Sequence, residues 1–263
     1  METPEQQKLD QDHVRRLHRA LTGSSGELFQ IITDPSPDVL HSSLKNPNLN
    51  EDHLLALLKR IDLSENLLKA IYQFEQKNRS RQLKKALVRN PNTPGPIALT
   101  LLPHLYLFEL VDLCFMPGVT PDQKLAAERT IIQRLPEIEL GNKITLARRA
   151  TADVVGAILK EGDPHLVSVC LNNSRLKEVS ILQFINSARA RPDTISAIAR
   201  HSKWKNRPNL RLAMLKNRNT PAVWFTLFLP NLKTTDLNNL LMSKRLNPAQ
   251  KKLVQGELKK RGG

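Results

Sequence analysis

Hydrophobic residues recur along most of the chain at the three- and four-residue spacing of α-helices, and short polar turns separate the apolar stretches. The region that follows the turn at 90–94 shows this pattern clearly. The apolar run at 97–105 carries hydrophobic residues on nearly all sides, as a buried helix does, and Pro103 should kink or end it. We expect a second short helix at 106–115 and a third, more amphipathic helix at 122–135. The pattern therefore predicts three helices in roughly 42 residues.

Four turns of similar sequence recur along the chain, each centred on an asparagine. These asparagines are Asn46, Asn90, Asn173 and Asn217, so successive turns differ by 44, 83 and 44 in residue number. The middle step, 83, corresponds to two repeats, one of which has lost the motif. The chain is therefore expected to be a series of helical units of about 42 residues.

A longer repeat relates the two halves of the chain. The segment 90–134 aligns without a gap with the segment 217–261, at a shift of 127, and 13 of the 45 positions are identical. Chance alone would give about three identities. The sequence predicts a duplicated cassette of three units, hence about six units in one continuous superhelical domain. The first cassette spans 1–134, with a capping helix at 1–25, and the second spans 135–263.

The period, the Leu-Xaa-Asn-Pro-Asn-Thr-Pro turn and the helix-rich units resemble armadillo and HEAT repeats, especially the degenerate bacterial forms that include leucine-rich-repeat variants. This resemblance implies an all-α fold, a right-handed α-solenoid in which stacked units bury their apolar stripes against one another. Only 4% of residues are aromatic and 10 are glycine, which also favours stacked helices over twisted sheets. Such repeats are not tied to one activity.

Positive charge is concentrated in the second half of the chain. The segment 1–139 carries 17 Lys and Arg against 18 Asp and Glu, whereas the segment 140–263 carries 23 against 7. Many of these cations fall in predicted turns, and equivalent turns of a solenoid line up along one edge. We therefore expect a basic ridge. Its candidate binding residues are Arg148, Arg149, Arg175, Lys177, Lys203, Trp204, Lys205, Arg207, Lys216, Arg218, Lys244 and Arg245.

The ridge has several possible roles. It could bind an acidic protein, the phosphate backbone of a nucleic acid or an anionic lipid surface, or it could simply be solvated. Trp204 lies between two lysines and could stack on a base or a partner side chain, or it could fill a gap between two helices. Trp224 and Phe225 lie in an apolar run and are expected in the core. The basic segment 259–263 is expected to be a frayed end.

Common catalytic and metal-binding motifs are missing from the sequence. It contains no Gly-rich phosphate loop, no His-Glu-Xaa-Xaa-His, no Cys-Xaa-Xaa-Cys and no Gly-Xaa-Ser-Xaa-Gly. The seven histidines are scattered, and we expect His13 and His18 to be solvated rather than to bind a metal. Cys114 and Cys170 lie in apolar runs and are expected to be buried hydrophobic residues. We therefore expect no catalytic site, no metal and no cofactor.

The first residues lack a secretory signal, and no apolar run approaches the ~18 residues of a membrane span, so a cytoplasmic location is expected. The sequence predicts a monomeric, non-enzymatic interaction scaffold that binds a partner macromolecule, with an acidic protein as the first candidate. Nucleic-acid binding through the basic ridge of 140–263 is the alternative. A third interpretation, a HEAT-like DNA glycosylase, is implied only by broad resemblance, because no catalytic acid or base-cradling motif can be assigned in this sequence.

Overall fold

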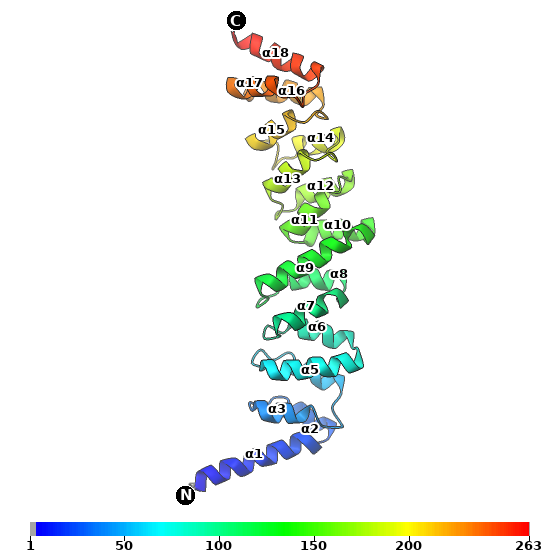
Figure 1. Ribbon diagram of the computed structural model, residues 1–263, viewed down its shortest axis with the longest axis vertical. Helices are drawn as coiled ribbons and strands as arrows, with labels where there is room; N and C mark the ends of the chain where they lie inside the picture. Colours follow the sequence, from blue (N-terminus) through cyan, green and yellow to red (C-terminus); the bar gives the residue numbers. More distant parts are fainter. Residues whose placement is uncertain (1–3, 263) are drawn as a thin grey trace. The chain divides into compact units, whose positions relative to one another are not determined.

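The computed structural model describes residues 4–262 and shows an all-helical protein (Figure 1). These residues form 18 α-helices and three 3-10 helices, and no strand is found among them. The predicted all-α fold is confirmed. The expected capping helix is α1 (Pro4–Thr22), and residues 1–3 of the predicted segment lie outside the described residues. No helix of the described chain has both the length and the apolar character needed to cross a bilayer.

The helices form two compact units, Met1–Ile131 (unit 1) and Ile132–Gly263 (unit 2), and the division falls inside α9. After α1, the helices up to the boundary are α2 (Ser25–Ile31), α3 (Pro37–Ser43), α4 (Glu51–Leu57), α5 (Glu65–Asn78), α6 (Arg81–Arg89), α7 (Gly95–Leu101), α8 (Leu107–Leu113) and α9 (Pro121–Arg134). The helices of unit 2 are α10 (Leu140–Arg149), α11 (Ala152–Leu159), α12 (Pro164–Asn172), α13 (Glu178–Ile185), α14 (Pro192–Arg200), α15 (Pro208–Leu215), α16 (Ala222–Phe228), α17 (Thr234–Met242) and α18 (Pro248–Gly262).

Within each unit, many helices pack against the helix two places further along the chain. In unit 1, α1 packs on α3, α3 on α5, α2 on α4 and α4 on α6. In unit 2, α10 packs on α12, α12 on α14, α11 on α13 and α13 on α15. Alternate helices therefore form two rows, and the buried Leu, Ile, Val and Ala side chains of the core fill the space between neighbouring helices.

The helices of the two units correspond at the shift found in the sequence. The first residues of α2 and α11 are 25 and 152, those of α6 and α15 are 81 and 208, and those of α9 and α18 are 121 and 248, a difference of 127 in each case. The 3-10 helices Leu102–His104 and Leu229–Asn231 are related by the same shift of 127. Pro103 lies in the first of them, directly after α7, so this proline ends the helix as predicted.

The repeated asparagines connect each turn to an earlier one. Asn173 is buried, and its Nδ2 donates to the carbonyl oxygens of Ala147 (2.8 Å) and Arg148 (3.2 Å) at the end of α10. Its Oδ1 accepts a hydrogen bond from the backbone N–H of Arg175 (2.8 Å). These bonds satisfy carbonyl groups that a helix end leaves without partners. The same two kinds of bond are made by Asn46, Asn90 and Asn217.

The C-terminal segment is helical rather than frayed. α18 continues to Gly262, and Arg261 holds it against the 3-10 helix Leu229–Asn231 and the residue that follows. The guanidinium of Arg261 donates to the carbonyl oxygens of Leu229 (2.9 Å), Pro230 (2.8 Å) and Leu232 (2.6 Å). The expectation of a frayed end is therefore wrong for residues 259–262, and residue 263 lies outside the described residues.

A candidate basic groove in unit 2

The predicted basic residues lie in the turns of unit 2, at opposite ends of its helices. α15 shows this division, because Arg207 lies at its N-terminal cap and Lys216 at its C-terminal cap. A helix of eight residues is about 12 Å long, so the two side chains start from opposite ends of the helix. The structure therefore divides the expected ridge into two groups of residues.

The first group lies at the C-terminal end of α10 and in the turns that follow α12 and α14, and carboxylates neutralise part of its charge. Lys177 pairs with Asp153 at 3.4 Å. Arg207 pairs with Glu178 at 3.9 Å. The basic members of this group are Arg148, Arg149, Arg175, Lys177, Lys203, Lys205 and Arg207. Because some of these cations are already engaged, this group is the weaker candidate for an anion-binding surface.

Trp204 belongs to the core. Its side chain is 2% exposed, and its Nε1 donates to the carbonyl oxygen of Leu171 at 2.9 Å. Burial leaves no ring face open to a base or to a partner, so Trp204 is not the predicted binding residue and instead fills the gap between helices. Trp224 and Phe225 are also buried, as predicted.

The second group surrounds one hollow. The turns that follow α13, α15 and α17 line a cavity of about 400 Å³. Gln250 of α18 holds the turn after α15, because its Nε2 donates to the carbonyl oxygens of Arg218 and Thr220, both at 3.1 Å. Among the described residues, no carboxylate lies within ion-pair distance of the cations of this group. These cations are Lys216, Arg218, Lys244 and Arg245.

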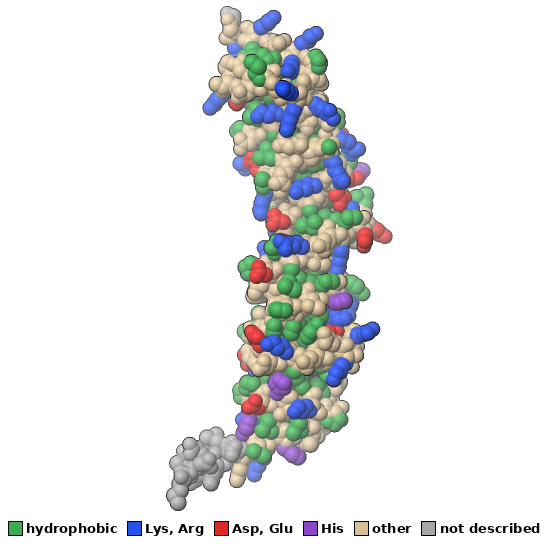
Figure 2. Space-filling model, viewed as in Figure 1, with side chains coloured by type: hydrophobic (Ala, Val, Ile, Leu, Met, Phe, Trp, Pro, Cys, Tyr) green, Lys and Arg blue, Asp and Glu red, His purple; other side chains and the backbone are tan. Residues whose placement is uncertain are grey.

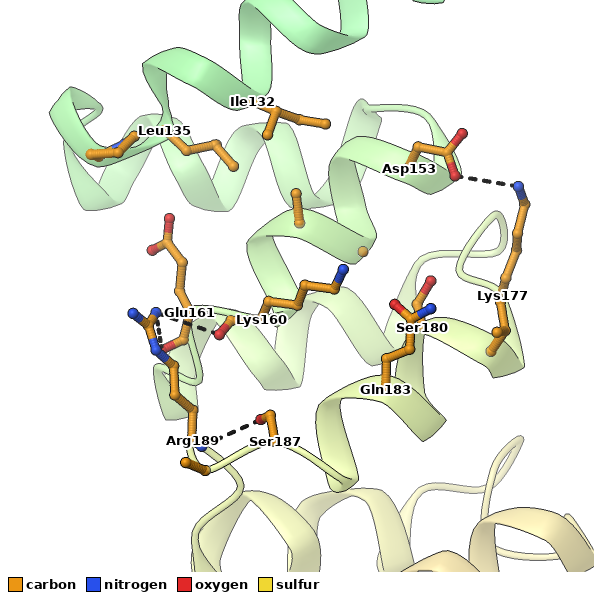
Figure 3. A pocket seen from close by; sticks show the side chains of 15 residues that line it. Ile132, Leu135, Asp153, Lys160, Glu161, Lys177, Ser180, Gln183, Ser187 and Arg189 are labelled. Carbon is orange, nitrogen blue, oxygen red and sulfur yellow. Dashed lines mark hydrogen bonds and ion pairs between the residues drawn. The ribbon is translucent and has the colours of Figure 1, made fainter.

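A larger cavity, of about 960 Å³, adjoins this hollow and shares Ser187 and Ala188 with it. Its lining comes from α11, α13 and the residues around the end of α9 (Figure 3). The ion pair between Asp153 and Lys177 lies at one end of the cavity, and Lys160 extends into the space between the two ends (Figure 3). Val179 adds an apolar side chain that is 52% exposed.

Arg189 marks the opposite end of this cavity. Its Nη1 lies 3.5 Å from the carbonyl oxygens of Lys160 and Glu161 (Figure 3). The close approach depends on Gly162, whose φ of +73° favours glycine, and whose missing Cβ would lie 3.0 Å from the carbonyl oxygen of Arg189. Glu161 is paired with Lys143 at 2.8 Å, so its negative charge is compensated locally.

A third cavity, of about 690 Å³, shares Arg189 and Ala188 with the larger one and adds Arg191. The three cavities therefore form one continuous lining, which we call the basic groove. Its cations are Lys143, Lys160, Lys177, Arg189, Arg191, Lys216, Arg218, Lys244 and Arg245, and its carboxylates are Asp153, Glu161 and Asp163. Three of the cations, Lys143, Lys177 and Arg191, are engaged in ion pairs. On the face drawn in Figure 2, Lys and Arg side chains gather over α15–α18.

The predicted binding residues do not include four of the groove cations, although a periodic signal marks part of the groove. These four are Lys143, Lys160, Arg189 and Arg191. Arg191, Arg218 and Arg245 follow one another at a constant step of 27 in residue number. From α10 to α15, each helix packs on the helix two places further along the chain, and the first residues of two such helices differ by 24 to 30 in residue number. Residues 27 apart therefore lie at the same end of two helices that pack on each other. A search at that step, beginning from Arg218, would have found Arg191.

The charge of the groove is not balanced elsewhere in its unit. The segment 132–263 contains 24 Lys and Arg against nine Asp and Glu. A surface of this kind attracts anionic chains over long range and accelerates their association. The groove is therefore suited to hold a polyanion by its charge.

The cysteines offer no reactive thiol. Burial, with a further contribution from Glu128, raises the pKa of Cys114 to about 11. Burial, with a further contribution from Glu161, raises the pKa of Cys170 to about 12. Both are buried free cysteines, as predicted, and nucleophilic chemistry requires an accessible thiolate. Within the described part of the chain, no three His, Cys, Asp or Glu side chains are grouped as a metal site.

No protein-family model matches the chain, and no curated protein or solved structure matches it. The geometry of the chain itself therefore carries the functional argument.

Proposed function

We propose that the chain is a non-enzymatic α-solenoid scaffold whose basic groove binds an acidic segment of a partner protein. Two observations support the solenoid. Many helices pack on the helix two places further along the chain, and helix positions recur at the shift of 127 in residue number. The packing favours helix pairs as the stacking layers, whereas the sequence period of about 42 residues spans three helices. HEAT and armadillo repeats are the class that this arrangement resembles.

The observation that carries the binding proposal is the groove itself, whose three carboxylates are outnumbered by nine cations along a continuous lining. Four of them, in the turns after α15 and α17, have no carboxylate partner among the described residues. Cations that are not paired within the molecule are available to a partner. The free-energy cost of removing water from them is offset when carboxylates of the partner take the place of that water.

The aromatic residues of unit 2 favour a protein over a single-stranded nucleic acid. Proteins that bind single strands stack bases on accessible aromatic side chains. All five aromatic residues of the segment 132–263 are buried: Phe184, Trp204, Trp224, Phe225 and Phe228. The groove instead offers aliphatic surface next to its cations, including Val179 and Ala157. An acidic protein segment supplies both carboxylates and apolar side chains, so it matches the lining better.

Fluorescence anisotropy tests the proposal with three labelled probes: a 20-residue Glu-rich peptide, a single-stranded 20-mer DNA and a duplex of the same length. The groove variant carries Arg189→Glu, Arg218→Glu and Arg245→Glu. The matched control carries Lys205→Glu, Lys252→Glu and Lys259→Glu, which reverse the same number of exposed charges outside the groove. We expect the groove variant to bind the peptide at least about tenfold more weakly and the control to lose much less.

Equal losses in the two variants would show that net charge alone attracts the peptide and would overturn the groove as its site. Tighter binding of either DNA, lost in the groove variant and steeply dependent on salt, would replace the acidic protein by a nucleic acid as the ligand.

A further inference from the structure

Unit 1 contains a hollow of about 710 Å³ with a different lining. Its lining includes the half-buried residues Leu55 and Ala56 of α4 and Ala86 of α6. Phe29 of α2 and Ile61, in the turn after α4, stand at its rim. These two side chains are 46% and 74% exposed, so the rim presents two large apolar side chains to solvent. Exposed apolar side chains that gather around a hollow are typical of binding sites.

This hollow corresponds in position to the cavity bounded by Lys216 and Arg218 in unit 2. The shift of 127 places Ile61 opposite Ala188, and Arg89 opposite Lys216. The same pair of turns thus forms a hollow in each unit, but a large apolar side chain in unit 1 replaces a small one in unit 2. The two hollows are therefore expected to select different ligands.

Some of the cations at the hollow of unit 1 already bind other groups of the protein, and others do not. Arg60 is engaged, because its Nη1 donates to the carbonyl oxygens of Ile32 and Asp34, both at 2.8 Å. Lys85 is also engaged, through an ion pair with Glu109 at 3.1 Å.

Lys59 and Arg89 are exposed, and among the described residues neither has an ion-pair partner. Asp52 is the one carboxylate in the lining. The hollow therefore combines an apolar rim with two available positive charges.

We propose that this hollow binds a short segment of a partner protein in which a large apolar side chain is flanked by carboxylates. The apolar side chain packs on Ile61, Phe29 and Leu55, and the carboxylates pair with Arg89 and Lys59. Charge complementarity selects this ligand over a neutral apolar peptide, and the apolar rim selects it over a purely acidic one. The proposal goes beyond the basic groove, because it assigns a second site with its own specificity to unit 1.

The test uses a labelled nine-residue peptide that has one Phe between two runs of Asp, with two matched peptides in which Ser replaces Phe or Asn replaces every Asp. The site variants are Ile61→Asp and Arg89→Glu in the full chain that already carries the groove substitutions Arg189→Glu, Arg218→Glu and Arg245→Glu, because the basic groove is itself proposed to bind acidic segments. The control variants, in the same background, are Leu99→Asp and Lys77→Glu, which make the same kinds of change at exposed residues of unit 1 outside this hollow. Circular dichroism and the Tm confirm that each variant is folded, which we expect because Ile61 and Arg89 are exposed.

We expect each site variant to weaken binding of the Phe peptide by about tenfold or more, and each control variant to leave it within about twofold. We also expect both matched peptides to bind the chain that carries only the groove substitutions at least about tenfold more weakly than the Phe peptide does. The proposal is overturned if the Phe peptide does not bind at about 1 mM, if the Ser peptide binds equally well, or if Lys77→Glu weakens binding as much as Arg89→Glu. The Glu-rich peptide is measured on the chain without the groove substitutions and reports on the basic groove, so a failure of one site is distinguishable from a failure of the other.

Discussion

The side-chain amide of Asn173 donates to the carbonyl oxygen of Ala147 at 2.8 Å and so ties the turn after α12 to the last turn of α10. Both groups are buried, which means that water cannot replace the bond when it is lost. Replacing Asn173 by Ala leaves the carbonyl oxygen without this donor and also removes the acceptor for the N–H of Arg175. We expect a loss of about 1–3 kcal/mol, seen as a lower Tm and a lower urea midpoint.

Asn186 supplies the control for this prediction. It is exposed, and its amide donates to Leu182 within its own helix. Asn186→Ala should therefore change stability by less than about 0.5 kcal/mol. If the two variants unfold at the same temperature, the bond between the two turns does not stabilise the fold.

The sequence predicted the helices well because their determinants are local. The apolar spacing, Pro103 and the Asn-centred turns each act within one or two turns of chain, and the structure contains the helices they predicted. The predicted buried positions of Trp224 and Cys170 followed from apolar runs for the same reason.

The placement of the cations depends on a property that is not local, namely how many helices separate two turns. Chain direction reverses from one packed helix to the next, so one intervening helix moves a turn to the opposite end. Arg175 and Lys203 have two helices between them, α13 and α14, so their turns lie at the same end. Lys203 and Lys216 have only α15 between them, so their turns lie at opposite ends. A single ridge would form only if turns separated by one helix and turns separated by two helices lay at the same end, and in this fold they do not.

The buried thiols give a test of the core in both units. The raised pKa values of Cys114 and Cys170, about 11 and about 12, mean that almost no thiolate forms at pH 8, and burial blocks access to reagents. We expect the folded protein to react with a disulfide reagent at the rate at which the chain opens, and to release two equivalents promptly in guanidinium chloride. Fast reaction of either thiol in buffer would contradict the packing around it.

The tryptophans give a spectroscopic test of burial in unit 2. Trp204 and Trp224 are 2% and 7% exposed, so emission should be blue-shifted and weakly quenched by acrylamide until the protein unfolds. Addition of single-stranded DNA should leave the emission unchanged, because neither ring can stack on a base. Trp204→Phe should lower stability by about 1–3 kcal/mol, because the carbonyl oxygen of Leu171 loses its donor. Strong quenching by DNA would instead place a tryptophan at the surface.

His201 predicts a pH dependence of stability. Its Nδ1 accepts a hydrogen bond from the backbone N–H of Lys203 at 3.3 Å, and a protonated ring cannot accept this bond. Burial, and then the charge of Lys203, lower the pKa of His201 below its ordinary value of 6.5. The unfolded chain therefore binds a proton at a higher pH than the folded chain does. The contribution of His201 is fully present above about pH 6.5 and is lost as the pH falls towards the lowered pKa of the folded state.

The substitution His201→Asn separates this titration from the structural role of the residue. Asn173 and Asn217 make the same bond to the N–H two residues further on, so an asparagine at 201 should keep the bond and remove the proton-binding group. We expect the Tm of the unmodified protein to fall more steeply between pH 7.5 and 5 than that of His201→Asn. His165 is exposed, so His165→Asn is the control and should leave the slope unchanged. If the Tm of all three proteins falls equally steeply with pH, protonation of His201 does not disturb the turn. The bond from the N–H of Lys203 would then make no pH-dependent contribution to stability.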